Sequence, residues 1–90
     1  MQIRFLVIEE QDIFLLGFPL KLTPTERKIL IAIANSEVIS SDELISLLPP
    51  NVSRGNITVH ISSINKKALA IGGRKLILFG EKHYKINENM

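Results

Sequence analysis

The segment RGNITVHISSINKKAL, residues 54–69, carries two opposite helical faces. At about 100° per residue, one side gathers four apolar residues within about 60°, and the other side gathers polar and cationic ones. Ser53 can cap the start of this helix and Gly72-Gly73 can end it. The pattern predicts a helix with one face in a core and one available to a partner. The apolar face holds Ile57, Ile61, Ile64 and Ala68, and the other face holds Asn56, Val59, Ser62, Ser63 and Lys66.

The charge around this helix is concentrated locally. Residues 44–80 contain five cationic side chains and no Asp or Glu, whereas residues 1–43 hold seven acidic side chains against four basic ones. A carboxylate facing a phosphate backbone would repel it, so an acid-free stretch with a polar to cationic helical face indicates nucleic-acid binding. The five cations are Arg54, Lys66, Lys67, Arg74 and Lys75.

Length and composition limit the alternatives. Ninety residues of which 46% are hydrophobic predict one folded domain. The absence of Cys excludes disulfides and thiolate zinc sites, and two histidines do not make a metal cluster, so no metal and no cofactor are expected. The longest apolar run, residues 29–34, is too short to span a membrane, and the N-terminus lacks the pattern of a signal peptide. We therefore expect a cytoplasmic protein that does not bind membranes.

Residues 1–22 favour short antiparallel strands. Side chains alternate over residues 3–8, a polar turn follows, and residues 13–16 form a second run. Residues 18–22 allow a third strand, which Pro19 limits to an edge or a strand start. A small antiparallel sheet is expected.

The segment TPTE, residues 23–26, is a strong helix start. The Thr23 hydroxyl can accept from the Glu26 N–H, Pro24 needs no donor at the first helical position, and Glu26 can bond back as a capping-box partner. The helix is expected to run to about Asn35. Its core stripe is Ile29, Leu30, Ile33 and Ala34, with Arg27 and Lys28 on the solvent side.

A second capping box, SSDE at residues 40–43, predicts another short helix. Leu44, Leu47 and Leu48 recur at i, i+3 and i+4, and Pro49-Pro50 ends the segment. Two capped helices separated by a few residues indicate a helix-turn-helix arrangement.

A hairpin is predicted after the last helix. Residues 75–79 and 82–86 flank Gly80-Glu81, a Gly-X pair suited to a two-residue type II′ turn. Residues 88–90 are expected to be a frayed tail. The chain is thus one domain, with a sheet over 1–22, three helices over 23–73 and a hairpin over 74–87.

Four segments together resemble the OmpR/PhoB-type DNA-binding domain of bacterial response regulators. They are LTPTERKIL at 22–30, VISSDELISLL at 38–48, ITVHISSINKKAL at 57–69 and YKI at 84–86. The resemblance implies an α+β fold, a winged helix-turn-helix with an N-terminal antiparallel sheet, three helices and a C-terminal β-hairpin wing.

The resemblance also implies a mode of action in transcription regulation within a two-component phosphorelay. The third helix would enter the major groove of double-stranded DNA, and the wing would approach the minor groove. Residues 49–52 could face RNA polymerase, and a receiver domain or second protomer could dock on the acidic N-terminal half. Relatives often place arginines along the third helix. Aligned on Val59-His60-Ile61, this chain has Gly55, Ser62, Ser63 and Asn65 there, with Arg54 displaced by one.

The candidate DNA contacts each have a simpler alternative. Asn56, His60 and Ser63 could contact base edges or phosphates, or they could form a solvated polar face. Val59 could touch a thymine methyl or be partly buried. Ser62 joins the polar face of the same helix. Lys66 and Lys67 could clamp phosphates, or they could complement the dipole near the helix C-terminus.

The hairpin supplies the remaining candidates. Arg74 precedes the wing and could serve solubility alone. Lys82 could face phosphate from the wing, although Glu81 beside it opposes deep insertion into a groove. The sequence carries no catalytic motif, so no enzymatic activity is expected. The alternative to DNA binding is a winged helix used as a protein–protein interaction module.

Overall fold

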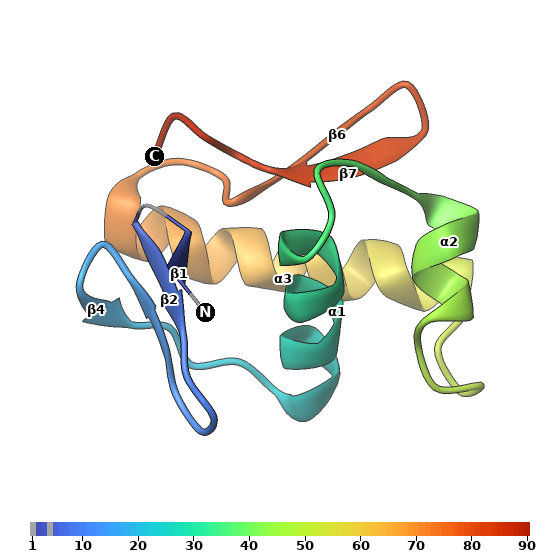
Figure 1. Ribbon diagram of the computed structural model, residues 1–90, viewed down its shortest axis with the longest axis horizontal. Coiled ribbons are helices and arrows are strands. Elements are labelled where there is room, and N and C mark those ends of the chain that lie inside the picture. Colours follow the sequence, from blue (N-terminus) through green and yellow to red (C-terminus); the bar gives the residue numbers. More distant parts are fainter. Residues whose placement is uncertain (1, 4) are drawn as a thin grey trace.

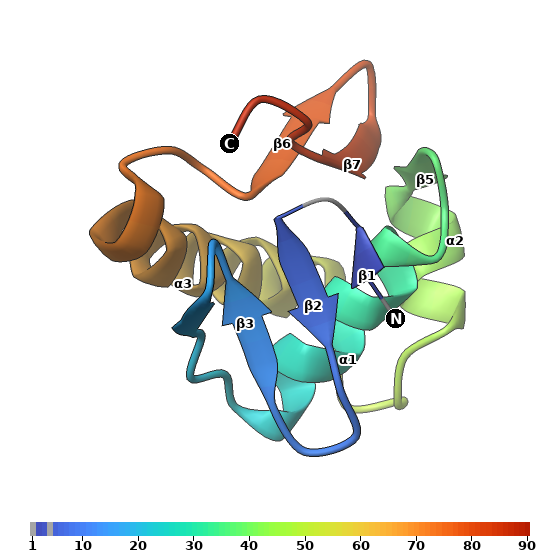
Figure 2. The same ribbon diagram turned by 60° about the vertical axis from the view of Figure 1, so that its left-hand side comes forward.

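Helix α3 crosses the middle of the molecule, and the other elements pack around it (Figure 1). The computed structural model describes residues 2–3 and 5–90. The N-terminal strands lie in front of α1 and α3 in Figure 2, and the C-terminal hairpin lies above these helices. The elements are β1 (Gln2–Ile3), β2 (Leu6–Ile8), β3 (Ile13–Leu15), β4 (Phe18–Pro19), α1 (Pro24–Ala34), β5 (Ile39–Ser40), α2 (Ser41–Ser46), α3 (Arg54–Gly72), β6 (Ile77–Gly80) and β7 (His83–Ile86).

The N-terminal strands form an antiparallel sheet in the order β1-β2-β3-β4, which confirms the predicted sheet. Val7 pairs with Phe14 on one face of the sheet. The residues on either side of this pair point to the other face, which packs against the helices, and they are buried. They are Leu6 and Ile8 in β2, and Ile13 and Leu15 in β3. Pro19 lies in the edge strand, as its missing N–H requires. The run predicted over residues 3–8 forms two strands, β1 and β2. The predicted third strand, 18–22, is the shorter β4, because the chain leaves the sheet after the Leu20 N–H donates to Ile13 O at 2.8 Å.

Helix α1 begins with the predicted capping box. The Glu26 N–H donates to the Thr23 hydroxyl at 3.2 Å, and the Thr23 N–H donates to Glu26 Oε1 at 2.9 Å. Three predicted core residues of this helix, Ile29, Leu30 and Ile33, are fully buried, and Ala34 is half-buried. Arg27 does not simply face solvent as predicted. It is half-buried, and its guanidinium donates to the Glu9 and Glu10 carbonyls, which ties α1 to the β2–β3 turn.

Helix α2 is capped by Ser40, whose hydroxyl accepts from the Glu43 N–H at 3.1 Å. Of the predicted Leu44, Leu47 and Leu48 face, only Leu44 is fully buried. The helix ends at Ser46, and a tighter turn in which the Leu47 N–H donates to Leu44 O at 3.2 Å leaves Leu47 65% exposed. Strand β5 was not predicted, because two residues are too few to show a periodicity.

Helix α3 has the predicted caps and core face. The Ser53 hydroxyl accepts from the Asn56 N–H at 3.3 Å, and Gly73 ends the helix at φ 73°, a left-handed conformation that glycine adopts without strain. The four residues of the predicted apolar stripe, Ile57, Ile61, Ile64 and Ala68, are all buried. They pack against α1 and the N-terminal sheet, since α3 contacts both.

The hairpin turn lies one residue later than predicted. Gly80 pairs with His83 inside the β6–β7 ladder, so Glu81 and Lys82 form the two-residue turn. Both have positive φ, 53° and 65°, which is typical of type I′ and not of the predicted type II′. The register buries Tyr84 and Ile86, and β7 is the middle strand of a sheet with the order β5-β7-β6.

The prediction of a frayed tail over residues 88–90 is wrong, because these residues are held in place. The Asn89 N–H donates to Asn87 Oδ1 at 2.9 Å, and Met90 is half-buried beside the end of α3. A Cβ on Gly72 would lie 2.8 Å from Leu16 Cδ1 and 3.2 Å from Met90 Cε, so glycine permits this close approach. The tail therefore closes the core at the C-terminal end of α3.

Candidate nucleic-acid interface

The outward side of α3 is the candidate DNA-facing surface. Val59 is 66% exposed there, and Ser62 and Lys66 are exposed on the same side. These positions lie at i, i+3 and i+7, which places them on one ridge opposite the core stripe. Of the two alternatives for Val59, the structure therefore gives exposure and not partial burial.

The side of α3 that faces α1 has a different role. Lys67 Nζ lies 2.6 Å from Glu26 Oε1, and Glu26 is only 3% exposed. Ser63 also hydrogen-bonds to this carboxyl group. Burial alone would raise the pKa of Glu26, but the hydrogen bonds from Lys67, Ser63 and the Thr23 backbone, together with the Lys67 charge, hold that pKa below its ordinary value of 4.5.

This network changes the interpretation of two predicted DNA contacts. Lys67 neutralises a buried carboxylate, so its charge is not available to a phosphate in this arrangement. Ser63 is half-buried on the same side and is hydrogen-bonded to the same group. His60, which precedes them on this side, is also half-buried. Of the predicted cluster of Asn56, His60 and Ser63, only Asn56 is exposed, and its side-chain amide donates to Asn51 O at 3.5 Å.

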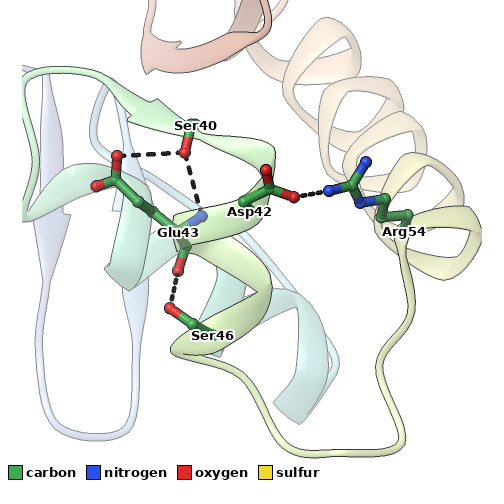
Figure 3. Close-up of polar contacts among 5 residues, drawn as sticks. All are labelled: Ser40, Asp42, Glu43, Ser46 and Arg54. Atoms are coloured by element: carbon green, nitrogen blue, oxygen red, sulfur yellow. Dashed lines mark hydrogen bonds and ion pairs between the residues drawn. The ribbon is translucent and has the colours of Figure 1, made fainter.

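The start of α3 is linked to α2 by charge. Asp42 and Arg54 point toward each other and form an ion pair, with 77% and 68% of their side chains exposed (Figure 3). Nearby, the Ser40 hydroxyl donates to Glu43 Oε1 at 3.2 Å, and the Ser46 hydroxyl donates to Glu43 O at 2.7 Å (Figure 3). Asp42 is therefore an anion placed directly at the first cationic residue of α3.

The predicted hairpin cations differ in their contacts. The Arg74 guanidinium donates to Asn89 O at 3.1 Å and so holds the C-terminal tail. Lys82 is exposed in the turn at the wing tip, beside His83, whose Nδ1 lies 2.7 Å from Glu81 O. Lys75 and Lys85 are exposed along the hairpin. Lys82 keeps the position expected of a wing contact, whereas Arg74 has a structural partner.

A groove of about 660 Å³ runs between α3, α2 and the hairpin. Its apolar surface includes Ile45, Leu69, Phe79 and Tyr84, and the Phe79 and Tyr84 rings lie 4.6 Å apart between centroids. Its polar lining includes three cations and no Asp or Glu, and these cations are Arg54, Lys66 and Lys75.

Asn65 is a positioning residue that sequence reasoning did not identify as buried. Its side-chain amide donates to Ile77 O at 3.0 Å and its carbonyl accepts from the Ile77 N–H at 2.8 Å. This pair of bonds fixes the first residue of β6 against α3, and so it sets where the wing lies relative to the helix. The signal available in sequence was its angular position, about 80° from Ile57, at the margin of the core stripe.

The residues that the structure describes carry no cluster of three or more His, Cys, Asp or Glu side chains suited to a metal ion. Within residues 2–3 and 5–90, no helix is both long and apolar enough to cross a membrane.

The arrangement of sheet, helices and hairpin defines a winged helix. Among solved structures, the chain is similar to the DNA-binding domain of the response regulator AdeR in complex with an intercistronic region. The TM-score is 0.76 at 21% sequence identity, and the match covers 96% of each chain. The fold expected from the OmpR/PhoB resemblance is therefore confirmed. Neither the protein-family models nor the curated proteins yield a match to this sequence.

Proposed function

We propose that this domain binds double-stranded DNA through the outward side of α3. The observation that carries the proposal is the exposed ridge of Val59, Ser62 and Lys66 on a helix that lies within a stretch of 37 residues, 44–80, without Asp or Glu. The AdeR domain, which shares the fold, is in complex with DNA. The same comparison supports a role as the sequence-specific effector domain of a bacterial response regulator.

In this arrangement α3 would enter the major groove, whose width of about 12 Å admits an α-helix. The hairpin would approach the adjacent backbone and minor groove with the Lys82 turn. Lys66 and Lys82 would contact phosphates, and Arg54 would do so by exchanging its exposed ion pair with Asp42 for a phosphate. Val59 would contact a thymine methyl. Asn56 and Ser62 would contact base edges. Ser63, Lys67 and Arg74 have partners within the domain, and His60 is half-buried, so these four contribute less.

The wider setting follows from the same fold comparison. The domain would act in the cytoplasm as the output of a two-component phosphorelay. Residues 49–52, which lie in the connection between α2 and α3, would be available to RNA polymerase. The N-terminal sheet, whose β2–β3 turn carries Glu9, Glu10 and Asp12, would face a receiver domain or a second protomer.

Salt dependence tests the DNA proposal. Three phosphate contacts predict that log K against log salt falls with a slope of about −3. Lys66→Ala should reduce that slope by about one, because one contact is lost. Lys28→Ala is the matched control, since Lys28 is exposed on α1 and lies outside the acid-free stretch. It should leave the slope unchanged.

The alternative is a winged helix that serves as a protein–protein interaction module. A correctly folded domain that binds no duplex at about 50 mM salt would favour this alternative, because non-specific phosphate contacts are strongest at low salt.

A further inference from the structure

The groove between α3 and the hairpin is long enough to hold a helix of a partner protein. Its lining residues on α3 run from Arg54 to Leu69 at intervals of three and four residues, which is one continuous stripe. Fifteen residues of helix extend about 22 Å, the length of about four helical turns. Ile45 of α2 lies on one side and Phe79 of the hairpin on the other. A groove of this length suits a helix better than a compact small molecule.

The apolar walls of the groove require a partner with apolar side chains. Phe79 is 59% exposed and Leu69 is 43% exposed, and both line the groove. A phosphate placed against them would lose water without gaining hydrogen bonds. Leucine-like side chains on a partner helix would instead remove this apolar surface from water, as in helix-in-groove recognition.

The charge of the groove selects the sign of the partner. Arg54 and Lys66 lie twelve residues apart along α3, about 18 Å, and Lys75 lies near the hairpin. No Asp or Glu is among the lining residues, although exposed Asp42 of α2 forms an ion pair with Arg54. A partner helix with carboxylates beside its apolar stripe would match this pattern, and a basic one would be repelled.

We propose that this groove binds an acidic amphipathic helix of a partner protein, and that this partner excludes DNA. The exclusion follows because Arg54 and Lys66 belong both to the groove and to the proposed DNA-binding surface. Only the exclusion rests on the proposed function. The binding of an acidic helix to the groove stands on the groove itself.

A labelled peptide tests the binding directly. The probe is a fluorescein-tagged peptide of about 18 residues, with Leu at i, i+3, i+4 and i+7 spacing and Glu on the flanks, followed by fluorescence anisotropy with the full chain. Binding in the micromolar range is expected. A peptide of the same composition in shuffled order, and one with Lys in place of Glu, should both bind at least about tenfold more weakly.

Matched aromatic variants locate the site. Phe79→Ala should weaken binding about fivefold or more, whereas Phe18→Ala should change it by less than about twofold. Phe18 is 61% exposed on β4, close to the exposure of Phe79, but it does not line the groove. Leu69→Glu adds a second test, because a carboxylate in the groove should repel the acidic peptide. Circular dichroism of each variant verifies that the domain is folded.

The outcomes separate this proposal from DNA binding. The acidic peptide should displace a bound duplex in a dose-dependent manner. No peptide binding, equal binding of the shuffled peptide, or equal loss in Phe79→Ala and Phe18→Ala would overturn the groove assignment. Peptide and duplex bound at the same time would overturn the exclusion. If no duplex binds at all, the anisotropy measurement still decides whether the groove takes the peptide.

Discussion

The pairs Ser62-Ser63 and Lys66-Lys67 are each divided between two sides of α3. Ser63 and Lys67 contact the buried carboxyl of Glu26 on the side facing α1, whereas Ser62 and Lys66 are exposed on the outward side. Adjacent helical residues point about 100° apart, so identical neighbours meet different surroundings. The contrast teaches that a polar or cationic side chain adds to a binding surface only where the fold does not commit it to a buried partner.

Removing core volume should give the largest effect and test the orientation of α3. Ile61→Ala should cost about 2–5 kcal/mol of unfolding free energy, because Ile61 is buried on the core-facing side of α3. Val59→Ala, on the opposite side, should change it by less than about 0.5 kcal/mol. Chemical denaturation measures both. Similar losses in the two variants would mean that the helix is rotated differently.

The two lysines should separate stability from binding. Lys67→Ala should cost about 1–3 kcal/mol, because the carboxylate of Glu26 stays buried without its cation. The cost stays below that of a fully buried pair, since the Lys67 side chain is 36% exposed. Lys66→Ala should change stability by less than about 0.5 kcal/mol. Denaturant titrations at pH 7 test this difference, and equal effects would contradict the proposed roles.

Acidification should weaken the same network. The pKa of Glu26 is lowered in the folded protein, so its contribution to stability is present above its unfolded pKa and is lost as pH falls through the folded pKa. The stability gap between the wild type and Lys67→Ala should therefore narrow below about pH 4.5, the ordinary value. Denaturation at a series of pH values between about 7 and 3 measures the gap. A gap that stays constant would show that Glu26 is not the group involved.

Capping signals explain how much of the fold could be predicted from the sequence. Thr23, Ser40 and Ser53 act locally, through hydrogen bonds within three residues, so the helix starts needed no tertiary information. The sequence predicts the hairpin turn one residue too early, because glycine is favoured at the first central position of a type II′ turn and Gly80 fits that position. In the fold, Gly80 pairs within the ladder and Glu81 and Lys82 take positive φ instead. The pairing register of β7 with β5 on its other side outweighs that local preference.

The candidate site was less predictable than the fold. The periodicity of α3 identified its core face, but the partners of Lys67 and Arg74 come from residues 41 and 15 positions away in sequence, Glu26 and Asn89. Such distant pairings leave no periodic signal. The groove beside Phe79 was likewise not predicted, since it depends on where Asn65 anchors the hairpin.

Base selection and phosphate attraction should depend on different residues of α3. Asn56→Ala should cost about 1–3 kcal/mol on the preferred site and little on random DNA, because a side-chain amide can pair with a base edge. Lys66→Ala should weaken all sequences nearly equally. Selection from randomised duplexes, repeated with each variant, measures this. A motif that survives Asn56→Ala, or shifts in Lys66→Ala, would place a different part of α3 in the groove.

The smallest expected effect concerns the ion pair between α2 and α3. Asp42 competes with a phosphate for the Arg54 guanidinium, so Asp42→Asn should raise DNA affinity. Both side chains are largely exposed, and exposed pairs are weak, so the gain should be only about two- to fivefold. Asp12→Asn, on the β2–β3 turn, is the matched control for removing one negative charge away from α3.

Titration of both variants with one duplex at several salt concentrations distinguishes local from overall charge. The advantage of Asp42→Asn should shrink as salt rises, because screening weakens both the ion pair and the phosphate contact. The double variant Asp42→Asn with Arg54→Ala should lose the gain entirely, since no guanidinium is left to release. Equal gains in Asp42→Asn and Asp12→Asn would show that net charge alone governs affinity and that Arg54 is not held back by its partner.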